Sequence, residues 1–345
     1  MVKIGIYGGS GYTGQELLRL LLNHPDCEVT AITSRRYRGT AVPDLYPHFR
    51  GLTDLEFMDA SPEAVAEFCD AVFLAVPHGE AMDSAPRFLE ARKKVIDLSA
   101  DFRLRDPVTY EKWYLPHRSP ELLPEAVYGL PELYRDAITE ARLTANPGCY
   151  PTCAILGLAP LLKGGWIDSR TLIIDAKSGA SGAGRTLNAG TLFCEVNEGF
   201  KAYKVGAHRH RPEIEQELSL LAGFDIRVIF TPHLIPANRG ILSTMYGTPA
   251  KNVRPADLIE VYREFYSNAP FVRICDEGIV PSISSVKGSN FCDLGIAVDD
   301  STGQILVISA IDNLIKGAAG QAIQNMNIMF GLPEDRGLGL VPLFP

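Results

Sequence analysis

Residues 2–14, VKIGIYGGSGYTG, decide the fold of the first part of the chain. The apolar run at residues 2–7 predicts a buried β-strand, and a helical pattern follows at residues 13–22. The turn between them matches the G-x-G-x-x-G fingerprint, whose glycines let a pyrophosphate approach the N-terminus of a helix. The stretch therefore predicts a dinucleotide site formed by Gly9, Ser10, Gly11, Tyr12, Thr13 and Gly14. The alternative is a plain strand-to-helix turn.

The residues after the second expected strand indicate which dinucleotide the turn would bind. An NAD site usually has an acid there, which binds the ribose 2′-hydroxyl. This chain has Ser34, Arg35 and Arg36 instead, and a hydroxyl with two guanidinium groups suits a 2′-phosphate. We therefore expect NADP or NADPH. The alternative is a solvated basic loop.

Further patterns define two domains. Strand-like runs at residues 28–33, 71–76 and 94–98 alternate with helical patterns, which predicts a parallel sheet covered on both faces. After Pro147 strands predominate, with runs expected at residues 172–175, 226–231, 241–246, 294–298 and 305–311. Helices are expected there at residues 152–162, 212–221, 255–266 and 314–329. The fold class is thus an α/β Rossmann-type parallel-sheet domain plus a second α+β domain with a largely antiparallel sheet.

Composition excludes several classes of protein. The chain has 345 residues, 46% of them hydrophobic and 21% charged, which fits two globular domains and not a disordered chain. A net charge of −8 argues against nucleic acid as a partner. Nothing reaches the stretch of about 20 apolar residues that a membrane span needs, and no signal-peptide pattern opens the chain. We expect a cytoplasmic protein with no membrane partner.

Of the seven cysteines, Cys149 has the most distinctive surroundings. No CxxC pair or finger-like Cys/His spacing occurs, so we expect free thiols and no metal site. Cys149 lies in NPGCYPT, residues 146–152, just before an apolar helical run. Free N–H groups at a helix start favour a thiolate and stabilise a nearby oxygen anion. Cys149 is therefore the candidate nucleophile, and Cys153 is interpreted as core.

A nucleophilic thiol also needs a partner that moves protons. Residues 206–213, GAHRHRPE, place His208 and His210 between arginines just before another helix. Such a cluster can activate Cys149 and protonate a leaving group. Metal binding by the His-x-His pair is the alternative, which the lack of nearby carboxylate or cysteine ligands disfavours.

Two other polar segments follow expected strands. Residues 97–103 lie where parallel strands end at a ligand crevice, which makes Arg103 a candidate anion-binding residue. Residues 177–185 are rich in glycine and include Ser178 and Gly179. This segment is either a surface loop or backbone that lies close to the nicotinamide or the substrate.

Taken in order, these motifs resemble the N-acetyl-gamma-glutamyl-phosphate reductase family, NADPH-dependent enzymes of arginine biosynthesis. NPGCYPT and His-Arg-His are the most specific parts. The glycine fingerprint and further segments complete the match over nearly the whole chain, at residues 97–103, 128–132, 178–185 and 312–321.

The resemblance implies a domain organisation and a set of roles. Residues 1–147 and 313–345 would form the NADP-binding domain, and residues 148–312 the catalytic and dimerisation domain. Cys149 would be the nucleophile, His208 the acid/base, and Asn313, Ser178 and Gly179 neighbours of the cofactor. His210 is the reserve acid/base and a substrate-binding candidate, and Arg103 would hold the phosphate.

The implied reaction starts from a small acyl phosphate. The Cys149 thiolate would expel inorganic phosphate and form a thioester, and hydride transfer from NADPH would then give the aldehyde. A homodimer or homotetramer built through the second sheet is expected. The alternatives are the same chemistry on a carrier-bound aminoadipyl phosphate of lysine biosynthesis, aspartate-semialdehyde dehydrogenase, and a non-catalytic NADP-binding sensor.

Overall fold

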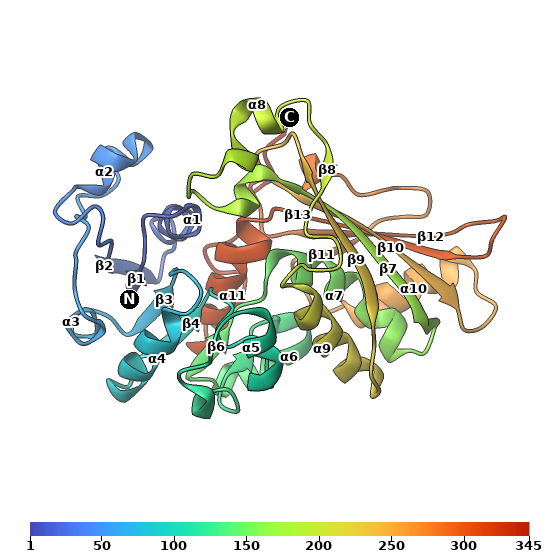
Figure 1. Cartoon of the computed structure of the whole chain (residues 1–345), viewed down its shortest axis with the longest axis horizontal. Helices are drawn as coiled ribbons and strands as arrows, with labels where there is room; N and C mark the ends of the chain where they lie inside the picture. The colour runs from blue at the N-terminus through green and yellow to red at the C-terminus, as the bar shows by residue number, and fades with distance from the viewer. Residues whose placement is uncertain (345) are drawn as a thin grey trace. The chain divides into compact units, whose positions relative to one another are not determined.

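The computed structural model describes residues 1–344, with the backbone alone at residues 169 and 171. The chain divides into two compact units, residues 1–147 with 318–339 and residues 148–317 with 340–345 (Figure 1). Residues 313–317 and 340–345, expected in the nucleotide domain, thus belong to the second unit. Hydrogen bonds hold them there: the Asn313 side chain binds Gly240 and Ser181, and the Leu343 N–H donates to the Lys287 carbonyl.

The first unit contains a six-stranded sheet in the order β2-β1-β3-β4-β6-β5. All of its recorded strand pairs are parallel, and every residue of β3 is buried. A sheet buried on both faces reads as continuous apolar runs, which explains why β1 to β4 were predicted from the sequence, whereas the short strands β5 and β6 were not. The strands are β1 (Val2–Tyr7), β2 (Cys27–Ile32), β3 (Ala71–Leu74), β4 (Lys94–Asp97), β5 (Val127–Tyr128) and β6 (Leu143–Ala145).

Helix α11 (Gly320–Met329) joins this unit from the far end of the sequence. All ten of its residues are buried. The Gln321 and Asn325 side chains both donate to the Gly129 carbonyl, at 2.8 and 2.9 Å, so the polar residues of the helix are used for packing. The other helices of the unit are α1 (Tyr12–Leu21), α2 (Val42–Leu45), α3 (Pro62–Ala66), α4 (Ala81–Glu90), α5 (Pro107–Trp113), α6 (Pro131–Glu140) and the short 3₁₀ turns η1 (Pro47–Phe49) and η2 (Pro120–Leu122).

The second unit contains a seven-stranded sheet in the order β11-β12-β13-β10-β7-β9-β8. Four of the six neighbouring pairs are antiparallel, while β7 with β9 and β11 with β12 are parallel. The predicted largely antiparallel sheet is therefore confirmed. Its strands are β7 (Ile167–Gly179), β8 (Lys201–Ala202), β9 (Val228–Ile235), β10 (Ile241–Pro249), β11 (Val272–Ile274), β12 (Cys292–Val298) and β13 (Ile305–Ile311).

Helices cover one face of this sheet. Helix α7 approaches it so closely that a Cβ on Gly157 would lie 2.3 Å from the Met245 side chain. Residues of β10 alternate between buried and half-buried, so the opposite face is the less covered one. The helices and turns are α7 (Cys149–Lys163), α8 (Phe193–Val196), α9 (Arg211–Ala222), α10 (Pro255–Phe265), η3 (Ala180–Ala183), η4 (Ala189–Thr191), η5 (Ile283–Ser285) and the π-helical turn η6 (Ile315–Ala319).

Two boundaries differ from the sequence-based prediction. Helix α7 begins at Cys149 and not at residue 152, because Gly148 already has an extended conformation and ends the preceding loop. Strand β7 is thirteen residues long, although only residues 172–175 were predicted. It pairs with β10 on one side and β9 on the other, so backbone pairing and not apolar sequence extends it. No helix within residues 1–344 has the length and apolar character of a membrane span.

Candidate active site

The glycine turn of the first unit combines packing with an open surface. A Cβ on Gly9 would lie 2.3 Å from the Ile32 side chain, and one on Gly14 would lie 2.5 Å from the Gly9 Cα. These two glycines let the turn and α1 pack closely on the sheet. A Cβ on Gly11 would meet nothing within 4 Å, and α1 starts directly after it without a side-chain cap. The open backbone and the uncapped helix start fit a pyrophosphate.

The end of β2 lies beside this turn. The Ser34 hydroxyl, nearly buried, donates to the Ser10 hydroxyl at 2.9 Å, and the Tyr46 hydroxyl donates to the Ser10 carbonyl at 2.6 Å. Arg35 and Arg36 are exposed, with the Arg36 guanidinium 5.4 Å from the centre of the Tyr37 ring. The cationic groups and the hydroxyl fit a ribose that carries a 2′-phosphate.

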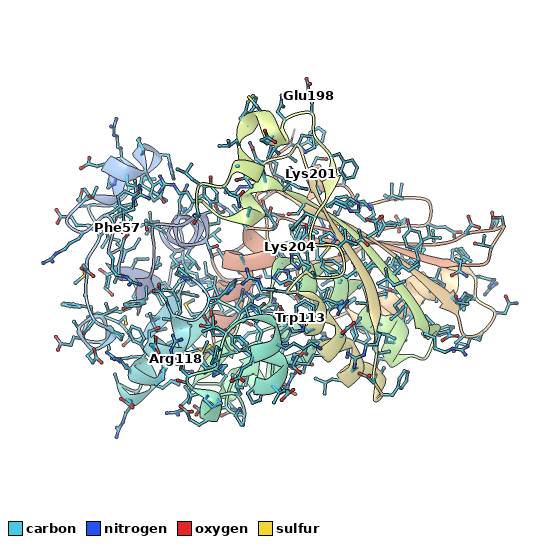
Figure 2. All side chains as sticks on the ribbon, viewed as in Figure 1. Phe57, Trp113, Arg118, Glu198, Lys201 and Lys204 are labelled. Atoms are coloured by element: carbon cyan, nitrogen blue, oxygen red, sulfur yellow. The ribbon has the colours of Figure 1, made fainter. Side chains whose placement is uncertain are left out.

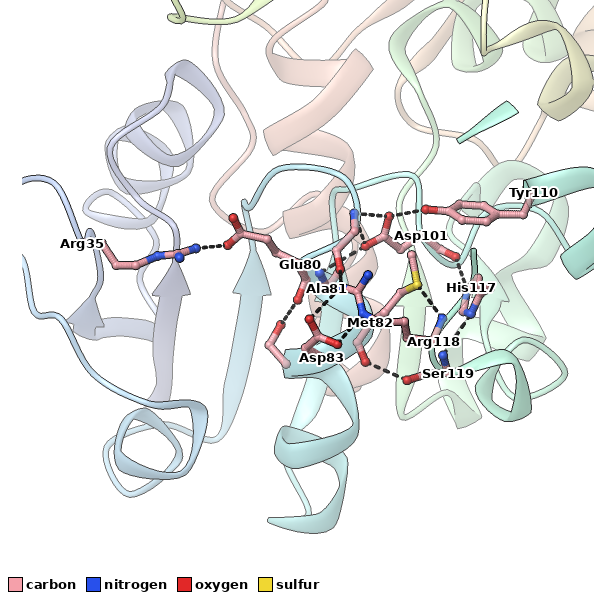
Figure 3. Close-up of polar contacts among 12 residues, drawn as sticks. Arg35, Glu80, Ala81, Met82, Asp83, Asp101, Tyr110, His117, Arg118 and Ser119 are labelled. Carbon is pink, nitrogen blue, oxygen red and sulfur yellow. Dashed lines mark hydrogen bonds and ion pairs between the residues drawn. The ribbon is translucent and has the colours of Figure 1, made fainter. Parts of the chain in front are cut away.

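An acid that the sequence did not reveal also reaches the end of β2. The Arg35 guanidinium forms an ion pair with Glu80, which directly precedes α4 (Figure 3). The loop that carries Glu80 is held in place because the Asp101 carboxylate accepts N–H bonds from Gly79, at 2.8 Å, and Ala81, at 3.1 Å. Since Glu80 follows a different strand, no spacing rule along β2 could have identified it.

Two buried carboxylates, those of Asp97 and Asp101, hold the loop of residues 97–103. Asp101 also accepts a hydrogen bond of 2.8 Å from the Tyr110 hydroxyl (Figure 3). Asp97 is completely buried, and burial together with the negative charge of Asp101 raises its pKa to about 7. Its carboxylate accepts hydrogen bonds of 2.8 Å from the Ser99 N–H and hydroxyl. These contacts define the shape of residues 97–103.

Arg103 is 7% exposed and makes two contacts with backbone carbonyls. Its Nε donates to the Asn146 carbonyl at 2.7 Å, and Nη2 donates to the Leu98 carbonyl at 2.9 Å. The guanidinium therefore ties its own loop to the segment that leads to the candidate nucleophile. Phosphate binding by Arg103 stays a prediction.

In the second unit, Cys149 is the first residue of α7 and is half-buried. The thiol is therefore carried by the first turn of this helix, where free N–H groups and the helix dipole favour negative charge. Burial raises the pKa of five other thiols and keeps them protonated: Cys27, Cys69, Cys153, Cys275 and Cys292. Cys194 is exposed on α8.

A buried glutamate fixes the peptide before the candidate nucleophile. Glu213 of α9 is 1% exposed, and its Oε1 accepts the Gly148 N–H at 2.8 Å. The Gly148 carbonyl in turn accepts both the N–H and the hydroxyl of Thr152, at 2.9 and 3.0 Å. Glu213 ends the GAHRHRPE segment, and its sequence pattern predicts no role for it. Its function as an anchor depends on the packing of α9 against α7, which the sequence does not reveal.

The two histidines lie against the residue that follows Cys149. The ring centres of His208 and His210 are 4.8 Å apart. The centre of the Tyr150 ring lies 5.5 Å from that of His208 and 5.9 Å from that of His210. The backbone N–H of His210 donates to Nδ1 of the His208 ring at 3.1 Å. Nδ1 is therefore an acceptor, and the neutral ring carries its proton on Nε2.

Burial, followed by the positive charges of Lys204 and Arg209, lowers the pKa of His208 to about 4. The ring is thus neutral near pH 7. Lys204 has a φ of 46°, which is unusual for a residue with a side chain. It lies in the segment after Lys201 (Figure 2). The sequence does not indicate that Lys204 lies near His208, because this neighbourhood depends on how the segment folds.

The remaining predicted site residues gather at one end of β7. Ser178 and Gly179 end this strand, and a Cβ on Gly179 would lie 2.8 Å from the Arg239 nitrogen. Asn313 accepts the Gly240 N–H at 2.7 Å and donates to the Ser181 hydroxyl at 3.0 Å. The structure thus brings these residues together within the second unit, and their contact with a cofactor stays a prediction. Within residues 1–344 no group of three His, Cys, Asp or Glu side chains is arranged for a metal ion.

Comparison with known proteins agrees with this arrangement. The family model described as "Semialdehyde dehydrogenase, NAD binding domain" matches residues 3–141, and "Semialdehyde dehydrogenase, dimerisation domain" matches residues 149–313. N-acetyl-gamma-glutamyl-phosphate reductases from Citrifermentans bemidjiense and Geobacter sp. strain M21 are each 59% identical, and the one from Desulfotalea psychrophila is 55% identical. All three alignments cover 100% of both chains. The chain belongs to the N-acetyl-gamma-glutamyl-phosphate reductase family.

Solved structures extend the comparison to the fold of this reductase family. Aspartate semialdehyde dehydrogenase II from Vibrio cholerae has a TM-score of 0.73 at 16% identity, covering 96% of this chain and 98% of that one. The Candida albicans aspartate semialdehyde dehydrogenase with NADP has a TM-score of 0.72 at 18% identity, with the same coverage. The predicted two-domain fold class and the dinucleotide-binding unit are confirmed.

Proposed function

We propose that this chain catalyses the NADPH-dependent reductive dephosphorylation of N-acetyl-L-glutamyl 5-phosphate to N-acetyl-L-glutamate 5-semialdehyde, a step of arginine biosynthesis. The observation that carries the proposal is the position of Cys149 as the first residue of α7, with its preceding peptide held by Glu213. The names of the relatives, 59% identical over the full length, supply the substrate.

The first half of the reaction forms a thioester on Cys149. The thiolate sulfur bonds to the acyl carbon, the carbon–oxygen bond to the phosphoryl group breaks, and inorganic phosphate leaves with the electron pair. N–H groups at the start of α7 stabilise the oxygen anion that forms in between. Cys149 reacts as the thiolate that the start of α7 favours. His208, the predicted acid/base, lies against Tyr150 and carries its proton on Nε2, so it is suited to act as the donor in the second half of the reaction.

The second half releases the aldehyde. Residues 9–14 and the end of β2 would hold NADPH, which would supply a hydride for the thioester carbon. The resulting oxygen anion collapses as the carbon–sulfur bond breaks, which gives the aldehyde and restores the Cys149 thiolate. We assign the Nε2–H of His208 as the hydrogen-bond donor to this oxygen, since Nδ1 accepts the His210 N–H. Arg103 and His210 are the candidate residues for the phosphate and the substrate.

The reverse reaction offers a direct test. Purified protein supplied with NADP, phosphate and N-acetylglutamate semialdehyde should produce NADPH, detected by its absorbance, and Cys149→Ala should produce none. Turnover only with the carrier-bound aminoadipate semialdehyde would move the protein to lysine biosynthesis. Binding of NADP without turnover of either aldehyde would indicate a sensor.

The uncovered face of the second sheet supports a homodimer or homotetramer. A cytoplasmic location is proposed separately, from membership of a family of biosynthetic enzymes. On this face Ile173 is 38% exposed and Ile229 62% exposed, and Tyr246, Leu306 and Ile308 are half-buried beside them. An exposed apolar row of this kind across four neighbouring strands is typical of a protein–protein interface. Light scattering should give a multiple of 37.7 kDa, and Ile229→Lys should shift the mass toward one chain. Fractionation of cells would test the location.

A further inference from the structure

The π-helical turn η6 follows a segment that one buried carboxylate holds. Asp312 is completely buried, and its Oδ1 accepts the N–H groups of Leu314 and Ile315 at 2.8 and 3.3 Å. Its Oδ2 accepts the Gly288 N–H at 2.8 Å, and its backbone carbonyl accepts the Gly317 N–H at 3.0 Å. The position of Gly317 is therefore fixed by bonds at the start of the turn.

Gly317 lies directly against the nucleophile. A Cβ built on Gly317 would be 2.8 Å from the Cys149 Cβ and 3.2 Å from the Cys149 Cα, with Ile311 at 3.3 Å on another side. Separations below 3.0 Å essentially never occur between real Cβ atoms and their neighbours. The φ of Gly317 is not positive, so its backbone conformation does not demand glycine. The close approach to Cys149 is what excludes a side chain.

We infer that Gly317 is a positioning residue for Cys149. The turn rests against the backbone of Cys149 on one side, and Glu213 holds Gly148 on the other. Together they fix where the thiol stands relative to the first N–H groups of α7. The inference depends on the proposed nucleophilic role of Cys149.

Gly317→Ala tests this role. Relief of the overlap requires the Cys149 Cβ or the turn to move by several tenths of an ångström, and misplacement of a reacting group by about 1 Å can lower a rate about 100-fold. We expect kcat to fall between about 10- and 100-fold. The Kd for NADPH, measured by fluorescence titration, should change far less than kcat, because most of the predicted NADPH-binding residues, 9–14 and 34–36, belong to the other unit.

A second readout needs neither substrate nor cofactor. Iodoacetamide alkylates Cys149 when the thiolate sulfur displaces iodide, and mass spectrometry after digestion follows the reaction at this residue. In Gly317→Ala the thiol is displaced from the helix N–H groups that favour its ionised form. Alkylation at pH 7 should therefore slow several-fold, and its pH profile should move to higher pH.

Gly157→Ala is the matched control. Gly157 is buried in the same helix, and its new Cβ would meet the mobile end of Met245 at 2.3 Å. It should lower the melting temperature to a similar extent while kcat and the alkylation profile stay close to those of the wild type.

Several outcomes would overturn the inference. One is a Gly317→Ala variant whose kcat and alkylation rate equal those of the wild type. Another is an equal fall in kcat and alkylation rate in Gly317→Ala and Gly157→Ala. If Gly317→Ala does not fold, Asp312→Asn, which weakens the hold on the turn, should lower kcat and alkylation in the same direction. No effect of Asp312→Asn would then refute the role of the turn. If the wild-type protein is alkylated at Cys149 but turns over no aldehyde, the proposed function is contradicted. The difference in alkylation rate between the wild type and Gly317→Ala would still test whether Gly317 positions the thiol.

Discussion

The glycine turn, which is the predicted nucleotide site, and the surroundings of Cys149, the proposed nucleophile, are built in different ways. In the turn, six consecutive residues after one strand supply the backbone, and the contact of Gly14 against Gly9 lies within these six residues. The nucleophile site has one motif residue, Cys149, and its supports come from α9 and from the turn after β13. A local site can be recognised as a motif, whereas an assembled site depends on how distant segments pack.

Replacement of the nucleophile should separate the two regions most strongly. Cys149→Ser should lower kcat by more than about 10³-fold, because a serine hydroxyl is far less ionised and less nucleophilic than a thiol. NADPH should bind with unchanged Kd in a fluorescence titration. A parallel loss of NADPH binding would break the comparison, since it would show that the thiol side chain also supports the nucleotide turn.

Within the turn, the glycines should differ by role. Gly11→Ala places a methyl group in open space, so stability should be kept while the Kd for NADPH rises at least about 10-fold through loss of close pyrophosphate approach. Gly9→Ala overlaps Ile32 and should lower the melting temperature. Calorimetry and NADPH titration on both variants distinguish these effects, and equal destabilisation would contradict the open position of Gly11.

Glu213 tests whether the nucleophile site depends on distant support. Glu213→Ala leaves the buried Gly148 N–H without its acceptor, which costs about 1–3 kcal/mol. The loosened Cys149 should lose about 10-fold in kcat. Glu213→Gln keeps an oxygen acceptor and should retain more of the activity. Urea unfolding and steady-state kinetics measure the pair, and identical behaviour of the two variants would argue against the hydrogen bond.

Glu80 tests whether the nucleotide turn is as local as it looks. Its carboxylate forms an ion pair with Arg35, so its negative charge should repel a 2′-phosphate that binds the same guanidinium. Glu80→Gln should raise the preference for NADPH over NADH a few-fold, measured as the ratio of the two Kd values. Glu63→Gln, which breaks the exposed pair with Arg87, is the control. An unchanged or lower ratio in Glu80→Gln would show that Arg35 does not receive the phosphate.

The smallest effect concerns pH. The pKa of His208 is lowered to about 4 in the folded chain, against about 6.5 when unfolded. Between these values the unfolded chain binds more protons, so the stability present above pH 6.5 decreases as the pH falls toward 4. His208→Asn should reduce this decrease, seen as a smaller change in urea midpoint between pH 7 and pH 5. No difference from the wild type would show that His208 titrates normally.

Sequence patterns located the longer strands of both sheets and missed the shortest ones, β5, β6, β8 and β11. Every residue of β3 is buried, so its apolar run was plain. In β7, buried positions alternate with half-buried or exposed ones over residues 172–178, and only residues 172–175 were predicted. Helix α7 was placed three residues late, because the prolines around Cys149 obscured its start. The last predicted helix divides into the π-helical turn η6 and α11, a difference of hydrogen bonding that composition does not encode.

By itself, the sequence determined the nucleotide turn, the basic end of β2 and a single cysteine at a helix start. These features are local, because glycine, proline and charge act within a few residues. Tertiary structure alone decided that Glu80 reaches Arg35, that Glu213 holds Gly148 and that Gly317 rests on Cys149. Those contacts join residues far apart along the chain, and only close packing of the folded segments brings them within a few ångströms.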